Sequence, residues 1–462
     1  MKLKLMLLLS LAMPASADTL ADALASAYAS NPDLAAQRAV VRQVDELVPQ
    51  AIAAVRPAVT PSASLQQVMG PSFQNEGRLF SGGVTISQPL FRGGRTWSSI
   101  EAGEQRIFAA RARLRLVENS VLVNTLTAYA DVLRTAEIVK LNENQVRVLE
   151  QQLRASRDRF EVGDLTRTDV AQSEARLANA NSNLIAAQGA AIAAQQAYQR
   201  VVGRPPVDLA PIPPLPPLPA SAAEALALAR DSAPTLLAAR FDEGAAKADV
   251  RTARGQWLPT VTLNATGTYQ ELTGLPNGVG TRVVDGFAPG VGVTASIPLY
   301  SGGLTGSAVR QAQARQSQLL ELIASADRAV VEAVNNGWAG VETARATQVS
   351  AKSAIAANAL AAEGVRQENS VGSRTILEVL NAEQELLNSR VTLAQADRDV
   401  AVATYTLLAS IGRAEAIALG LPVEAYDVAV NAKRVRGIIS DWNVDPDPRR
   451  TPERNHAKKK AQ

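Results

Sequence analysis

The chain contains two copies of one pattern, and this duplication limits its possible folds more than any other feature. Residues 90–203 align with residues 299–412 at a constant offset of 209, without a gap. Residues 23–65 align with residues 225–267 at an offset of 202. Self-similarity at long period is the signature of a repeated architecture. We therefore predict one pseudo-symmetric body of two similar halves.

The repeats and the stretches between them predict the organisation of the chain. We expect a signal peptide over 1–17, a first repeat over 18–204, a proline-rich connector over 205–219, a second repeat over 220–412, and a C-terminal segment over 413–462. Each repeat should contain a helix, two strands and a long helical hairpin. The connector should be extended and stiff, and the basic end of the C-terminal segment should be disordered.

The first residues have the pattern of an export signal. Lys2 and Lys4 precede a short apolar run, and Pro14 is followed by Ala15-Ser16-Ala17. Positive residues, an apolar run and small residues at a cleavage site are typical of a signal peptide. A membrane anchor is the less favoured alternative, because the run is well below the ~20 residues that span a bilayer. We expect an exported protein.

The composition excludes several classes of function. The chain has no cysteine, and its single histidine, His456, lies in the tail. Disulfides, thiol catalysis and zinc sites built on cysteine are thus absent, and histidine-based catalysis is nearly excluded. A net charge of +3 with no basic domain is no nucleic-acid signature. We expect no enzymatic activity, no cofactor, no metal site and no nucleic-acid partner.

Four stretches alternate between apolar and small polar residues with a period of two. They are residues 60–68, 82–88, 260–269 and 291–297. An ordinary half-exposed sheet is the simplest explanation of alternation alone. Export favours membrane strands instead, as do aromatic residues near the strand ends, since aromatic residues gather at membrane interfaces. These aromatic residues are Phe73, Phe80, Phe91, Trp97, Trp257, Tyr269, Phe287 and Tyr300.

Four strands are too few to close a barrel in lipid, where an open edge leaves backbone groups unpaired. Closure would need several copies of the chain. Two copies would supply eight strands and three would supply twelve, and both even numbers occur in barrels. The strand pattern leaves this choice open.

The rest of each half reads as helix. Residues 95–162 contain no proline and predict a helix of roughly 100 Å, and residues 168–203 predict a shorter return helix. Apolar residues recur every seventh position in these stretches and in the second copy, which indicates a coiled-coil-like seam. In the return helices these residues are Val170, Leu177, Leu184, Ala191 and Tyr198, then Val379, Leu386, Leu393, Val400 and Leu407. The helical stretches 19–55 and 221–256 should stack end-on to the return helices, so that each half supplies two full-length struts.

Order, duplication and turn motifs together resemble one family. Each half carries Pro-Leu-aromatic-x-Gly-Gly between its strands and its long helix, at 89–94 and 298–303. The chain resembles the TolC-type outer-membrane efflux proteins over residues 19–420. The resemblance implies an α+β, mainly α membrane protein, which forms a homotrimer. Its twelve-stranded β-barrel, four strands per chain, would lie in the lipid of the outer membrane and continue into a periplasmic α-helical barrel.

The resemblance also implies a function and partners. The family acts as the passive exit duct of tripartite export systems, in type I protein secretion or drug efflux. A periplasmic adaptor (membrane-fusion) protein and an inner-membrane ABC or proton-driven transporter would be its partners. Because the chain has no cysteine that could be lipidated, it is more similar to the secretion-type branch of the family than to the lipoprotein branch. Glycines would form the turns: Gly163 and Gly372 at the hairpin tips, and Gly93, Gly94, Gly302 and Gly303 between strand and helix.

The family closes its periplasmic entrance at the hairpin tips, which implies a gate here. Arg374 matches an arginine that is tied to a Thr-Asp pair, matched by Thr168 and Asp169. Glu378 and Asn381 match two carboxylates of a constricting ring, so one of the two charges would be missing. Alone, Thr168 or a neighbouring residue would more simply be an N-cap of the return helix.

Two other functions remain as alternatives. An exported structural coiled-coil or surface-assembly protein would need long helices without membrane strands. An exported enzyme or binding protein would need a phosphate loop, a nucleophile with its base, or a metal cluster, and the sequence offers none.

Overall fold

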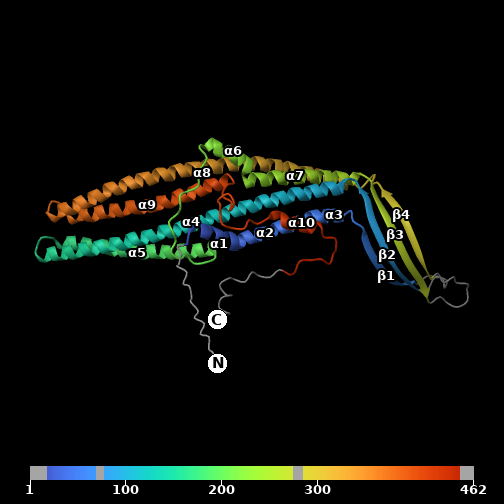
Figure 1. Ribbon diagram of the computed structural model, residues 1–462, viewed down its shortest axis with the longest axis horizontal. Coiled ribbons are helices and arrows are strands. Elements are labelled where there is room, and N and C mark those ends of the chain that lie inside the picture. The colour runs from blue at the N-terminus through green and yellow to red at the C-terminus, as the bar shows by residue number, and fades with distance from the viewer. Residues whose placement is uncertain (1–17, 69–76, 274–284, 448–462) are drawn as a thin grey trace, which may run out of the picture.

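The computed structural model describes residues 18–68, 77–273 and 285–447 of the 462 in the chain. The predicted signal peptide, Phe73 and the basic tail with His456 lie outside these residues. The molecule is elongated, with a β-sheet at one end and two helical hairpin tips at the other (Figure 1).

The two halves have the same order of elements. The first half contains α1 (Leu20–Ser30), α2 (Pro32–Asp45), α3 (Leu47–Ala53), β1 (Ala58–Val68), β2 (Gly77–Arg92), α4 (Arg95–Glu161) and α5 (Arg167–Val202). The second contains α6 (Ala222–Ser232), α7 (Pro234–Arg254), the 3-10 turn η1 (Gly255–Trp257), β3 (Thr260–Thr273), β4 (Gly286–Ser296), α8 (Leu304–Ser370) and α9 (Ile376–Ser410). A last helix, α10 (Val428–Arg436), follows. The long helices α4 and α8 have 67 residues each.

The sheet is antiparallel in the order β1-β2-β3-β4, so β1 and β4 each have one unpaired edge within the described chain. The strands have 11 to 16 residues, enough for the ~9–11 residues of a tilted membrane strand. They lie where the alternation predicts them but extend further. Within the described residues, no helix combines the length and apolarity needed to cross a bilayer.

Sevenfold spacing governs the packing of the return helices. In α5 the buried positions include Ser173, Ala180, Ala187 and Ala194. These small residues permit close approach of α4, while Val170, Leu177 and Leu184 of the predicted seam are half-buried and Tyr198 is fully buried. In α9 the predicted seam itself is mostly buried, with Val379, Leu386, Val400 and Leu407 below 10 % exposure.

The predicted end-on stacking of short and long helices occurs in both halves. The Ser30 hydroxyl lies 3.5 Å from the carbonyl oxygen of Val202 at the end of α5. In the second half the Ser232 hydroxyl donates to the carbonyl oxygen of Ile411 at 2.7 Å. The side-chain amide of Asn31 also donates a hydrogen bond of 3.2 Å to the Val201 carbonyl oxygen. Each long strut therefore continues through a polar joint into the next helix.

The proline-rich connector crosses the middle of the molecule (Figure 1). Its apolar residues Leu209, Ile212 and Leu215 pack against the core of the first half. The Tyr129 hydroxyl lies 2.6 Å from the Ala210 carbonyl oxygen and 2.9 Å from that of Asp18. The connector is thus fastened to α4 as an extended segment.

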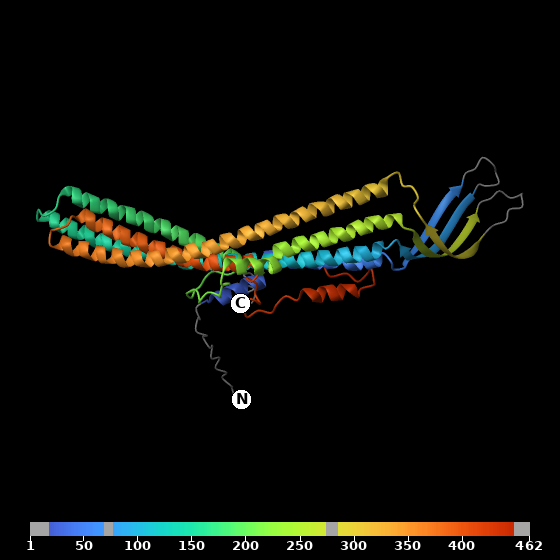
Figure 2. The same cartoon turned by 90° about the horizontal axis from the view of Figure 1, so that it is seen from above.

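The segment after α9 folds back onto the body of the molecule. It lies along the first half, where α10 packs on α2 and α3 (Figure 2). Glu415 pairs with Arg115 at 2.5 Å, and Asn431 donates to the buried Asp45 at 2.8 Å. We did not predict α10, because its nine residues carry only a short apolar face.

Candidate functional site at the helical hairpin tips

Both hairpins reverse direction through the same glycine turn. Gly163 and Gly372 have positive φ angles of 83° and 82°, a conformation that glycine adopts without steric cost. The following amide of Asp164 bonds to the Arg159 carbonyl oxygen at 2.8 Å, and that of Ser373 bonds to the Glu368 carbonyl oxygen at 2.9 Å. These bonds close the ends of α4 and α8 in the Schellman manner.

Each return helix then begins with a capping box. The Thr166 side chain accepts from the Asp169 amide, and the Asp169 carboxylate accepts from the Thr166 amide at 3.0 Å. Thr375 and Glu378 make the same pair of bonds in the second hairpin. The N-cap is therefore Thr166, two residues before Thr168, which is exposed on the first turn of α5. The reciprocal bonding satisfies amides that a helix start otherwise leaves free.

Arg374 holds the second tip together. Its guanidinium pairs with Glu368 at 2.8 Å and with Glu378 at 2.7 Å. The Thr375 amide and Arg374 lower the pKa of the Glu378 carboxyl to about 2. Among the described residues of one chain, Arg374 is thus bonded within its own hairpin. Its predicted tie to Thr168 and Asp169 is not among the contacts of this single chain and stays a prediction.

Two arginines that we did not single out connect the hairpins. Arg176 of α5 donates to the Asn381 side-chain oxygen of α9 at 2.7 Å. Arg159 of α4 donates to the side-chain oxygen of Asn369 at 3.4 Å. The side-chain nitrogen of Asn369 in turn donates to the Arg374 carbonyl oxygen at 2.7 Å. Both amide residues thus link the tips. Arginine is common on all these helices, so no sequence signal separates these two from the rest.

An apolar cluster lies beneath these polar links. Ile376, Val379 and Leu380 of α9 are buried against Val146 and Leu149 of α4. The first turns of α9 are therefore anchored to the opposite hairpin by apolar burial, and the polar links set the arrangement at the rim.

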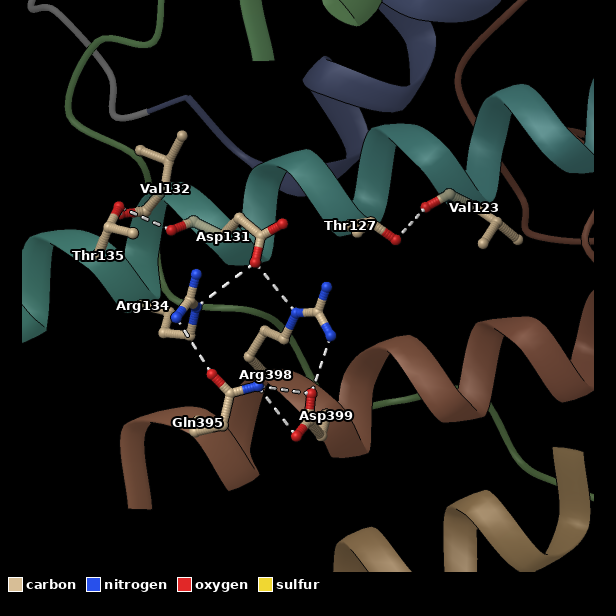
Figure 3. Close-up of polar contacts among 9 residues, drawn as sticks. All are labelled: Val123, Thr127, Asp131, Val132, Arg134, Thr135, Gln395, Arg398 and Asp399. Atoms are coloured by element: carbon tan, nitrogen blue, oxygen red, sulfur yellow. Dashed lines mark hydrogen bonds and ion pairs between the residues drawn. The ribbon is translucent and has the colours of Figure 1, made fainter. Parts of the chain in front are cut away.

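A second polar junction joins α4 to α9 far from the tips (Figure 3). Arg398 pairs with Asp131 at 3.0 Å and with its neighbour Asp399 at 2.9 Å. Arg134 lies 3.4 Å from Asp131 and donates to Gln395 at 3.1 Å. Two guanidiniums therefore share the Asp131 carboxylate, and the hairpins are fixed to each other at two levels.

The strand-to-helix turns also use glycine in the left-handed region. A side chain at Gly93 would place its Cβ 2.3 Å from the Gly255 carbonyl oxygen, so only glycine allows β2 and η1 to approach. The equivalent Gly302 has open space around it in the single chain. The φ angles are 62° at Gly93, 71° at Gly94, 62° at Gly302 and 83° at Gly303.

Comparison with known proteins supports the resemblance noted in the sequence. The family model described as "Outer membrane efflux protein" matches residues 23–204 and 225–413. The chain is 36 % identical over 424 residues to the outer membrane efflux protein BepC of Brucella suis biovar 1 (strain 1330), covering 91 % of each chain. It is 26 % identical to the outer membrane protein TolC of Vibrio cholerae serotype O1 (strain ATCC 39315 / El Tor Inaba N16961), over 83 % of this chain and 88 % of that protein.

A solved structure has the same fold. The outer membrane protein VceC of Vibrio cholerae superposes with a TM-score of 0.74 at 19 % identity, over 85 % of this chain and 96 % of that chain. The predicted fold class and outer-membrane location are confirmed, and family membership confirms that the protein is not an enzyme. The chain belongs to the TolC-type family of outer membrane efflux proteins.

Proposed function

We propose that three copies of the chain assemble into a passive exit duct, with a twelve-stranded barrel in the outer membrane and a helical tunnel in the periplasm. The observation that carries this proposal is the pair of open sheet edges at β1 and β4, because an open edge is not viable in lipid. An exported surface-assembly protein has no need for such a sheet.

The pairing inside one chain supplies a template for pairing between chains. Strands β2 and β3 join the two halves, and Ile86 lies opposite Ala265. The repeat offsets relate Ile86 to Ala295 of β4 and Ala265 to Ala63 of β1. Ala295 should therefore lie opposite Ala63 of the neighbouring copy.

Cysteine cross-linking tests this register, because the chain has no cysteine of its own. A variant with both Ala63→Cys and Ala295→Cys should oxidise into a covalent trimer, since facing residues bring their Cβ atoms within disulfide reach. The control pairs Ala295→Cys with Leu65→Cys, two positions out of register. Equal cross-linking of both variants, or of neither, would reject the proposed assembly.

The tips are the gate of this duct in our proposal. Glu378 would form a single three-fold carboxylate ring, and Asn381 leaves the second predicted ring uncharged. Arg374 balances much of the Glu378 charge, so attraction of cations at the constriction should be weak. Unchanged planar-bilayer conductance in both Arg374→Ala and Asp169→Ala would remove these residues from the gate.

The duct would work with a periplasmic adaptor protein and an inner-membrane ABC or proton-driven transporter. BepC is an efflux protein by name, which supports the use of the duct in efflux, while type I protein secretion is its other proposed use. Affinity capture of the cross-linked envelope complex, with identification of the transporter, would distinguish the two. Capture of the trimer alone after cross-linking would contradict the tripartite assignment.

A further inference from the structure

The C-terminal segment carries an exposed apolar turn that packing within the chain does not explain. After α10 ends, Ile439, Trp442 and Val444 are 78 %, 93 % and 78 % exposed. Trp442 is more exposed than any other tryptophan among the described residues. Single exposed apolar residues are ordinary, but three within six residues on one turn form a patch that calls for a partner.

Contacts with the first half fix the level of this turn along the molecule. Arg56, two residues before β1, donates to the Ile438 carbonyl oxygen at 3.0 Å. Arg436 pairs with Glu104 at 2.9 Å, and Arg111 donates to the Val428 carbonyl oxygen at 3.2 Å. Since Glu104 precedes Arg111 by about 10 Å along α4, the end of α10 points toward the sheet. Figures 1 and 2 both show the chain after α10 coming close to the start of β1 before it turns back.

The turn is also held in shape. Arg434 makes two bonds to the Asp445 carboxylate, of 2.7 and 2.9 Å. The Trp442 amide lies 3.3 Å from the Ser440 hydroxyl, and the Asn443 amide lies 3.3 Å from the Ser440 carbonyl oxygen. The Arg56 bond holds the other end. The apolar side chains are therefore presented on a fixed support.

We propose that this turn rests on the phospholipid surface of the outer membrane's periplasmic face, with the Trp442 indole among the headgroups. The sheet of this outer-membrane protein enters the bilayer beside Arg56, so the turn continues a lipid boundary that the fold already has. The exposed residues Trp97, Leu299 and Tyr300 lie at the same end of the sheet, where its strands join the long helices α4 and α8. Tryptophan favours this interface because one end of the ring is apolar and the other is polar. The apolar residues carry the contact, because Asp441 and Asp445 offset the basic end of α10.

Site-specific labelling in lipid vesicles tests the contact. A fluorophore on Ile439→Cys, with the indole kept, should be quenched by doxyl-labelled phospholipid and shielded from iodide in water. The matched control is Val430→Cys, also exposed at 62 % but on the first turns of α10, away from the sheet. Its label should be quenched by iodide and not by the lipid.

Two outcomes would overturn the proposal. Equal iodide quenching at 439 and 430 would mean that the turn stands in water. Shielding at 439 from both quenchers would mean that a neighbouring copy covers it. A second variant, Ile439→Cys with Trp442→Ser, separates the indole's contribution: loss of lipid quenching is expected, and undiminished quenching would contradict its role. The assay needs only the outer-membrane location, so it is independent of the gate and of the cargo.

Discussion

The seam between α4 and α7 predicts how neighbouring copies pack along the helical trunk. Arg113 of α4 forms an ion pair with Asp242 of α7. The repeat offsets relate Arg113 to Leu322 of α8 and Asp242 to Val40 of α2. Leu322 and Val40 are 46 % and 40 % exposed in the single chain. In the proposed trimer we expect Leu322 to pack against Val40 of the next copy.

The free energy that this contact contributes can be estimated from the exposure of the two side chains. Full burial of a leucine or valine stabilises by about 1.5–3 kcal/mol, so covering the exposed part contributes about 1 kcal/mol for each residue. The change Leu322→Arg loses this contribution and sets a guanidinium against Val40, at a cost of about 1–2 kcal/mol per seam. A closed ring has three seams, which gives about 3–6 kcal/mol for the trimer.

The assay is the temperature at which detergent-solubilised trimers dissociate into single chains, read by gel electrophoresis. Leu322→Arg and Val40→Asp should each lower this temperature. The double variant rebuilds the ion pair of Arg113 and Asp242 between copies. An exposed pair contributes about 0.2–1 kcal/mol per seam, so the double variant should be more stable than the sum of its single changes predicts.

Simple additivity would refute this reasoning, because it would mean that the two positions do not face each other. The control is Leu320→Arg, also on α8 and 51 % exposed. Leu320 corresponds to Arg111, which bonds to the C-terminal segment instead of facing α7. A loss as large as that of Leu322→Arg would show that any charge on α8 weakens the trimer.

Three further predictions concern the gate and the trunk. Arg176→Ala and Asn381→Ala remove the same 2.7 Å hydrogen bond. Since the loss of one such bond destabilises the closed tip by about 1 kcal/mol, each variant should raise the open probability in planar bilayers by about fivefold per link. The double variant should add little to either single change. Acidification from pH 7 to pH 5 should leave the tip closed, since Glu378 contributes stability that is complete above its ordinary pKa of 4.5 and declines progressively as the pH falls from there through about 2. A conductance step between pH 7 and pH 5 would contradict this. Asp131→Asn should lower the free energy of unfolding by about 1–3 kcal/mol, because Arg398 and Arg134 lose the negative charge that they share on α4. Thermal unfolding by circular dichroism measures it.

Sequence reasoning located the long elements because their signals are repeated many times. The helix predicted over 95–162 is observed as Arg95–Glu161. Strand β2 begins at Gly77, before the predicted start at residue 82, because Gly82 and Gly83 interrupt the alternation between Phe80 and Val84. At the tips, the turn glycines are evident locally, whereas the partners of Arg374 depend on which carboxylates its flexible side chain can reach. Two on its own hairpin lie within that reach.

The two repeats carry different residues at this seam, and the difference has a physical reason. Within one chain the seam at Arg113 and Asp242 is an exposed ion pair, which contributes little; a covalent connection already keeps the two halves together. Between copies the equivalent positions are Leu322 and Val40. Association of separate chains must overcome the loss of translational and rotational freedom, and apolar burial is the dominant favourable contribution to association. The duplicated contact is therefore apolar on the side where, in the proposed trimer, association is required, and ionic where the chain already holds the halves together.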